Sequence, residues 1–141
     1  MTGQPEVTAQ PARPADVDTA FWLWLAALPL MTTGYAISLL TSPEVPASVV
    51  TKLIVGLTTV VVLVVVSTFL VLMRSGYRWA RTVLTGGGIA SVVYSVSGLT
   101  HADARPSVAV PLAFTGIIGS VLIAAGTFLL HRAQSQEYFV R

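Results

Sequence analysis

The sequence predicts an all-α protein, a four-transmembrane-helix bundle with a disordered N-terminal tail. Formally charged residues make up only 10% of the 141 residues, against roughly 25% in soluble domains. Four stretches contain no Asp, Glu, Lys or Arg, namely residues 19–43, 53–73, 82–102 and 106–131. Each is at least 21 residues long, and a helix that spans a bilayer needs ~20 mostly apolar residues. An ordinary soluble domain is nearly excluded, because a soluble helix needs a polar face.

The transmembrane domain is expected over residues 20–130, after a flexible tail over residues 1–19. That tail carries three prolines and few large apolar side chains, so it cannot bury enough surface to become ordered. The first span is predicted over residues 20–40. Asp18 or Thr19 is the expected N-cap of this helix, because a short polar side chain can accept a hydrogen bond from a free N–H of the first turn.

Two features of the first span predict its position and shape. Phe21, Trp22 and Trp24 cluster near its start, where aromatic side chains anchor a helix at headgroup depth. Pro29 lies in mid-span and removes a backbone hydrogen bond, so a kink is expected there. Neighbouring helices can supply a partner for the freed carbonyl group, which makes proline tolerable in a membrane helix.

The other three spans follow after short connections. The second is predicted over residues 49–73; its valine-rich run is unbroken and too long for a barrel strand, which would alternate over ~10 residues. The third is predicted over residues 79–99, after a short turn, and the fourth over residues 107–130. Residues 131–141 form a mainly polar C-terminal tail.

The basic residues predict how the chain is oriented. With four spans, both tails and the turn over residues 74–81 lie on the same side of the membrane. This side carries six basic residues, which are Arg13, Arg74, Arg78, Arg81, Arg132 and Arg141. The other side carries only Lys52 and Arg105. Because cytoplasmic loops are enriched in Lys and Arg, the sequence predicts a multi-pass protein of the cell membrane with both termini in the cytoplasm.

Few residues could carry chemistry. The chain contains no cysteine, which removes disulfides, thiol redox relays and Cys-based metal sites. Ionisable residues inside a membrane usually mark proton relays and substrate sites. No Asp, Glu, Lys, Arg or His lies well within a span of this sequence, so this marker is missing. No serine has a candidate base nearby in sequence. The expectation is a non-enzymatic protein with no catalytic residue, cofactor or metal, and the net charge of +2 does not suggest nucleic-acid binding.

Small residues in the last two spans predict close helix packing. They recur at intervals of four residues, as Gly87, Ser91 and Ser95 and then as Gly116, Ser120 and Ala124. Such stripes allow two helix backbones to approach closely and gain dispersion contacts. One interpretation is that the third and fourth spans pack on each other within one subunit. The other is that these faces dock a second membrane protein or a second copy of the chain.

The turn between the second and third spans also has two interpretations. Arg74, Arg78 and Arg81 lie within eight residues of one another, beside Trp79. In the first interpretation, their only role is to determine the topology of the chain in the membrane. In the second, they bind anionic lipid headgroups or a cytoplasmic partner. Attraction to an anionic membrane surface contributes about 1 kcal/mol of binding free energy for each basic residue near it.

Two stretches carry a family resemblance. One is residues 18–25 (DTAFWLWL), and the other is residues 74–84 (RSGYRWARTVL). Together they resemble small four-span membrane proteins of unknown function that are widespread in actinobacteria. In those relatives the basic motif also lies at the turn between the second and third helices. The resemblance implies the four-span layout and carries no catalytic residue.

Two functions are consistent with these observations. The first is a non-enzymatic accessory or interaction subunit of a membrane complex, which would use the small-residue faces for its contacts. The alternative is a small oligomeric carrier or channel for a neutral or lipidic substrate. Under the first, substitution of Gly87 and Ser91 by Leu should break a complex, and under the second, the purified protein should move a solute across liposomes.

Overall fold

The computed structural model describes residues 12–46, 48–100, 105–132, 135, 138 and 139. These residues form four α-helices and no strand, and the helices are α1 (Ala15–Thr41), α2 (Val49–Arg74), α3 (Arg78–Thr100) and α4 (Pro106–Leu130). The four-helix fold predicted from the sequence is confirmed. The tail predicted over residues 1–19 falls mostly on residues 1–11, which lie outside the described residues.

All four helices are long and apolar enough to cross a membrane. Their outward surfaces are apolar as well. In α2 the buried residues are only Val55, Leu70 and Met73, and valines such as Val60 and Val64 are more than half exposed. A surface of this kind suits contact with lipid. The four long apolar helices and their apolar outer surfaces are those of a multi-pass membrane protein.

The start of α1 differs from the prediction. The helix begins at Ala15, five residues before the expected boundary, and its N-cap Pro14 makes no side-chain capping bond. Val17 is fully buried, so packing of an apolar residue stabilises this first turn. Asp18 does not cap the helix; its carboxylate forms an ion pair with Arg74, 2.8 Å from Nη2. At the middle of the span, α1 continues without a break through Pro29.

The turn between α2 and α3 requires a glycine. Gly76 has φ +91°, a conformation that side-chain-bearing residues rarely adopt. The N–H of Gly76 donates to the carbonyl of Met73, and the N–H of Tyr77 donates to that of Leu72. These two bonds are the Schellman arrangement that satisfies the last carbonyl groups of a helix. They end α2 and reverse the chain into α3.

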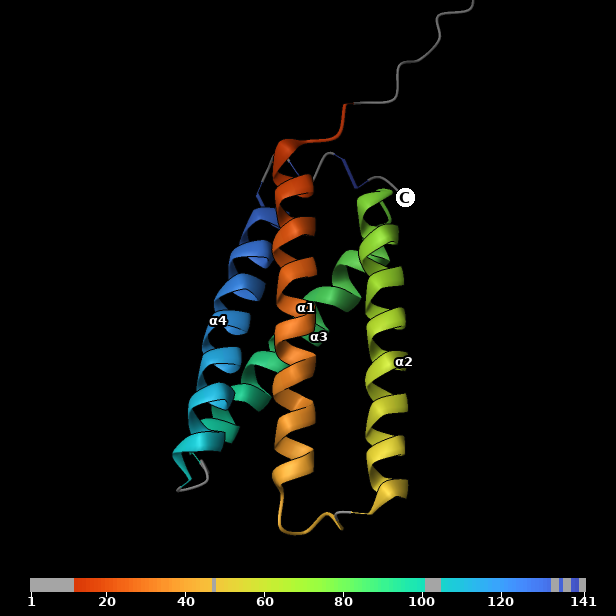
Figure 1. Ribbon diagram of the computed structural model, residues 1–141. Helices are drawn as coiled ribbons and strands as arrows, with labels where there is room; N and C mark the ends of the chain where they lie inside the picture. The colour runs from red at the N-terminus through yellow and green to blue at the C-terminus, as the bar shows by residue number, and fades with distance from the viewer. Residues whose placement is uncertain (1–11, 47, 101–104, 133–134, 136–137, 140–141) are drawn as a thin grey trace, which may run out of the picture.

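The helices are arranged unequally around α1 (Figure 1). α4 lies beside α1 along its length, and α2 lies on the other side of α1. α3 is strongly tilted: it starts beside the end of α2, crosses behind α1 and finishes near the start of α4 (Figure 1). We call the end with the 75–77 turn the terminal end, and the end with residues 42–46 the loop end.

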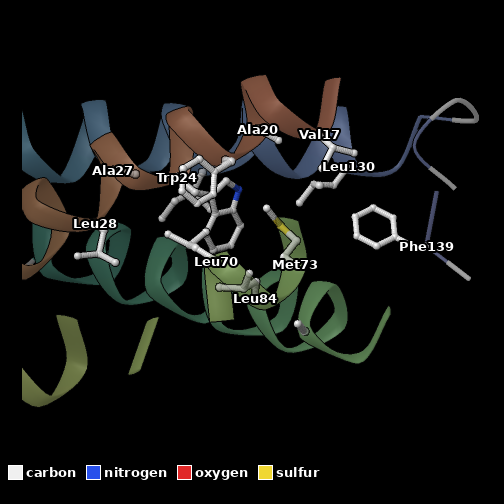
Figure 2. Close-up of a cluster of buried hydrophobic side chains, with 13 residues drawn as sticks. Val17, Ala20, Trp24, Ala27, Leu28, Leu70, Met73, Leu84, Leu130 and Phe139 are labelled. Carbon is white, nitrogen blue, oxygen red and sulfur yellow. The ribbon is translucent and has the colours of Figure 1, made fainter. Parts of the chain in front are cut away.

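The buried core lies toward the terminal end of the bundle (Figure 2). It is one cluster of apolar side chains to which every helix contributes, together with Phe139 from the C-terminal tail. Trp24 is at its centre and is 5% exposed. Phe21 is buried too, whereas Trp22 is 58% exposed. Only Trp22 can therefore serve as the headgroup anchor predicted for the aromatic cluster, because the other two side chains pack inside the protein.

Glycines bring α1 and α4 close together at three levels. A Cβ on Gly126 would overlap the indole ring of Trp24. A Cβ on Gly119 would lie 2.6 Å from Sδ of Met31, and one on Gly34 would lie 2.6 Å from Oγ1 of Thr115. The closest helix contact thus joins α1 to α4, as small residues permit in membranes, whereas one interpretation of the sequence stripes placed close packing between α3 and α4.

The stripe residues of α3 lie differently from the prediction. Gly87 and Ser91 are exposed, and a Cβ on Gly87 would meet no atom of the described residues within 4 Å. Their neighbour Gly88 is buried instead, and a Cβ there would lie 2.7 Å from Cη2 of Trp24 and 2.8 Å from Cγ2 of Ile123. At this level the residue of α3 that packs is therefore one position, or about 100° around the helix, away from the predicted Gly87.

The remaining stripe residues are divided between packed and exposed positions. Ser95 meets α4, since a Cβ on Gly116 would lie 3.6 Å from its Cβ. Ser120 is half-buried and Ala124 is exposed. Contact between α3 and α4 thus occurs near Ser95 and Gly116 and through Gly88 with Ile123, but it does not follow either predicted stripe along its length.

Candidate functional site

Residues of all four helices line a cavity of about 650 Å³ that is partly open at the surface of the bundle. Trp24, Gly88 and Ile123 line it and also pack together at the edge of the buried core, and we call this contact its floor. Phe69, Val83 and Leu84 extend the lining farther toward the terminal end. From this floor the lining continues toward the loop end through residues such as Tyr35 and Gly98. α3 tilts away from α2 toward the loop end (Figure 1), and residues of both helices contribute to the lining. Its volume lies within the roughly 300–1,000 Å³ range of small-molecule sites.

The lining is mostly apolar and carries hydroxyl groups. Its polar side chains are Thr32, Tyr35, Ser38, Thr59, Ser91, Tyr94, Ser95 and Thr115. Among the described residues that line it, none is Asp, Glu, Lys, Arg or His. A charged group placed here would be expensive to desolvate and would find no counter-charge. The cavity therefore suits an uncharged molecule.

Four of these eight hydroxyls donate their hydrogen within their own helix. Thr32 donates to the carbonyl of Leu28 at 2.8 Å, and Ser91 donates to that of Gly87 at 2.9 Å. The hydroxyls of Thr59 and Thr115 donate in the same way to carbonyls one turn earlier. Each of these oxygens thus faces the cavity as an acceptor only.

The hydroxyls of Ser38 and of two tyrosines of the lining have no acceptor among the described residues. The rings of Tyr35 and Tyr94 lie 6.2 Å apart between centroids, tilted by 57°, and the side chains are partly exposed. Neither hydroxyl donates to any group in the part of the chain that the structure describes. The two phenols are therefore donors that remain available at the loop-end side of the cavity.

The small residues singled out in the sequence thus form part of the cavity wall. Gly87, Ser91, Ser95 and Gly116 all line the cavity, whereas Ser120 and Ala124 are not among its lining residues. In α3, the stripe that predicted a close approach of helices is a part of the cavity wall without bulky side chains. Because these side chains are small, they leave volume for a ligand.

The basic turn is largely engaged within the chain. The guanidinium of Arg74 pairs with Asp18 at 2.8 Å and stacks on the ring of Phe21, 4.8 Å from its centroid. The backbone carbonyl of Arg74 accepts a hydrogen bond from the hydroxyl of Tyr138 at 2.8 Å. These contacts join the start of α1, the end of α2 and the C-terminal tail.

Arg81 has a similar role on the other side of the tail. Its guanidinium lies over the ring of Phe139, 4.9 Å from the centroid, and donates to the carbonyl of Leu130 at 3.4 Å. Phe139 is 2% exposed. Tyr138 and Phe139 of the tail predicted over 131–141 therefore pack against the turn, and an aromatic ring beside an arginine is stabilised by the cation.

Arg78 and Trp79 remain at the surface of this end. Both are exposed, and the indole of Trp79 packs edge-on against Phe69 with 5.5 Å between ring centroids. Of the four residues predicted to bind lipid or a partner, these two are exposed, whereas Arg74 and Arg81 are half-buried. A Trp beside an Arg suits the headgroup region of a bilayer.

Sequence reasoning missed the tyrosine pair and the cavity itself. Tyr35 and Tyr94 both occur six residues before the end of their helices, which is the signal that could have placed them at one level. The cavity depends on the tilt of α3, for which the sequence carries no such signal. Comparison of the chain with protein-family models, with curated proteins and with solved structures finds no match.

Proposed function

We propose that this chain is a non-enzymatic membrane protein that binds a neutral, lipidic molecule in the cavity between its four helices, as a binding protein or small carrier. The observation that supports this proposal is the cavity of about 650 Å³ with an apolar, hydroxyl-bearing lining. A molecule that fits such a site is itself mostly apolar and reaches it from the bilayer. This is the carrier alternative of the sequence analysis, and the geometry favours it over the accessory subunit.

Substitution of Gly87 by Leu tests the proposal. Gly87 lines the cavity and has free space around it, so the leucine side chain can be accommodated while it reduces the volume open to a ligand. Overlap with a bound molecule costs ~1–3 kcal/mol, and we expect the lipid that co-purifies in mild detergent to fall by roughly fivefold or more. Mass spectrometry of lipid extracted from the purified protein measures it.

Gly86→Leu is the matched control. Gly86 is also exposed and has no described atom within 4 Å of an added Cβ, but it is not among the residues that line the cavity. The Gly86→Leu protein should contain as much co-purified lipid as the unsubstituted protein. Equal lipid content in both variants would contradict binding in this cavity.

The accessory-subunit role is the second proposal, and the exposed face of α3 with Gly87 and Ser91 favours it. A transmembrane helix of another protein, or of a second copy, can approach such a face closely. The same Gly87→Leu protein distinguishes the two proposals. Loss of a partner or a smaller oligomer, with lipid content unchanged, would support the accessory role and oppose the binding role.

For the orientation we propose that both termini lie in the cytoplasm of a cell-membrane protein, with Arg78 and Trp79 against anionic headgroups. The supporting observation is the excess of basic residues at the terminal end, where Arg74, Arg78 and Arg81 lie. A reporter that is active only in the cytoplasm, fused to the C-terminus, should be active. Activity of a reporter that works only outside the cytoplasm would overturn the orientation.

A further inference from the structure

The hydrogen-bonding groups of the cavity indicate which neutral molecule it holds. Thr32, Thr59, Ser91 and Thr115 have used their hydrogens on their own helices. The hydroxyl of Ser95 is directed to Sδ of Met31, 3.8 Å away. The hydroxyls of the tyrosine pair and of Ser38, one turn after Tyr35 on α1, have no described acceptor.

The tyrosine pair lies well above the floor of the cavity. Tyr35 is eleven residues after Trp24 on α1, which is roughly 16 Å along the helix. The wall between these levels includes Ala27, Leu28 and Met31 from the same helix. A ligand that reaches both levels therefore has an apolar body beside this wall and a polar end beside the two phenols.

We propose that the hydroxyls of Tyr35 and Tyr94 donate hydrogen bonds to a carbonyl oxygen of an uncharged lipid, whose hydrocarbon body extends toward Trp24. This proposal rests on the proposed function and specifies its ligand class. An ester carbonyl of a diacylglycerol and a ring carbonyl of a quinone present the same acceptor chemistry. A pure hydrocarbon would leave both phenols unpaired, and an unpaired donor in an apolar site is costly.

A charged lipid fits less well. A carboxylate or phosphate near the tyrosine pair would be taken out of water without a cation, because no basic residue is among the described residues of the lining. Desolvation of such a charge costs far more than two phenol hydrogen bonds return. The tyrosines therefore favour an acceptor without a formal charge.

Trp24 supplies the measurement, since its ring lines the cavity and is quenched by bromine or by a quinone in contact with it. A protein with Trp22→Phe and Trp79→Phe keeps Trp24 as its only tryptophan. It is reconstituted in vesicles of dialkyl-ether phosphatidylcholine, which contain no ester carbonyl to compete. The probes are a diacylglycerol with dibrominated acyl chains, a decyl-substituted benzoquinone, and 9,10-dibromooctadecane as the probe without a carbonyl.

We expect one or both carbonyl probes to quench Trp24 at lower concentration than the hydrocarbon probe, and the more effective one identifies the source. Tyr35→Phe/Tyr94→Phe should raise the apparent dissociation constant of that probe by about tenfold or more, as for the loss of two ordinary hydrogen bonds. Its binding of the hydrocarbon probe should not change. Tyr77→Phe, in the turn outside the cavity, is the control and should leave all three probes unchanged.

Two results would overturn the inference. If the hydrocarbon probe quenches as strongly as the carbonyl probes, or the double tyrosine variant binds them as tightly as its parent, the carbonyl assignment fails and the lipid-binding cavity stands. If no probe quenches Trp24 at all, the proposed function fails with it. Gel filtration and the emission spectrum of Trp24 without probe verify that each variant is folded.

Discussion

Trp24→Ala is expected to destabilise the protein more than any other single substitution in α1. The indole packs against Gly88 of α3 and Gly126 of α4, and it lies in the buried core beside Leu70 of α2 (Figure 2). Its removal takes contacts from all three partner helices at once. In soluble cores, deletion of a buried Trp costs 3–5 kcal/mol, which includes a term for the cavity left behind.

The cost in this protein is expected at or below ~3 kcal/mol, because lipid can solvate an apolar surface as well as a side chain can. The packing and cavity terms remain, since the indole is buried and its neighbours Gly88 and Gly126 have no side chains to fill the space. Unfolding by titration with a denaturing detergent, followed by far-ultraviolet circular dichroism, measures the change. Trp22→Ala is the control, because Trp22 is exposed and its loss should change stability by less than ~1 kcal/mol.

A Trp24→Ala protein as stable as the Trp22→Ala protein would contradict the packing described above. It would mean that α1 is held to its neighbours without the indole, for example through Met31 and Gly119 alone. A large loss of stability confined to Trp24→Ala would instead place the main helix-to-helix contact at the cavity floor. In that case Trp24 both forms the floor of the cavity and holds together the helices that line it.

The spans could be predicted closely from the sequence because one physical term dominates them. Charged residues are excluded from the hydrocarbon region, so charge-free runs mark the helices. The expected bounds of the second and fourth spans differ from α2 and α4 by one residue at most at each end. The start of α1 was misplaced, because Asp16 and Asp18 suggested a polar tail, whereas Val17 between them is buried.

The packing faces could not be predicted in the same way, because the interval of four residues advances around a helix. Four residues turn through about 400°, so each step moves the stripe by about 40°. The buried residues of α4 instead include Gly119, Ile123, Gly126 and Leu130, at alternating intervals of four and three. That spacing keeps one face toward a neighbour over several turns, and it is the better signal in this sequence.

The roles of the basic residues were equally beyond sequence reasoning. The residues that engage Arg74 and Arg81 come from distant parts of the chain, Asp18 and Phe21 at the start and Tyr138 and Phe139 at the end. Composition reports only that the turn is basic. Which arginine stays free for a headgroup depends on where the tail folds back, and that is a tertiary property.

Gly126→Ala is the second substitution with a large expected effect. We expect it to lower the stability of the protein, although helix propensity alone would raise it. Alanine favours a helix over glycine by about 1 kcal/mol, and Gly86→Ala, where an added Cβ meets open space, should gain up to that amount. At Gly126 the new methyl group would overlap the indole of Trp24. Overpacking of this kind costs ~1–3 kcal/mol, so we expect a net loss of stability in the same detergent titration.

The double variant Trp24→Ala/Gly126→Ala determines whether the overlap is the cause. With the indole removed, the methyl group at position 126 has space, and its cost should disappear or change sign. The two changes would then be strongly non-additive, as expected for residues in direct contact. Additive losses would show that Gly126 is needed for another reason, such as the approach of the α1 backbone at the carbonyl of Ala20, 3.5 Å from an added Cβ.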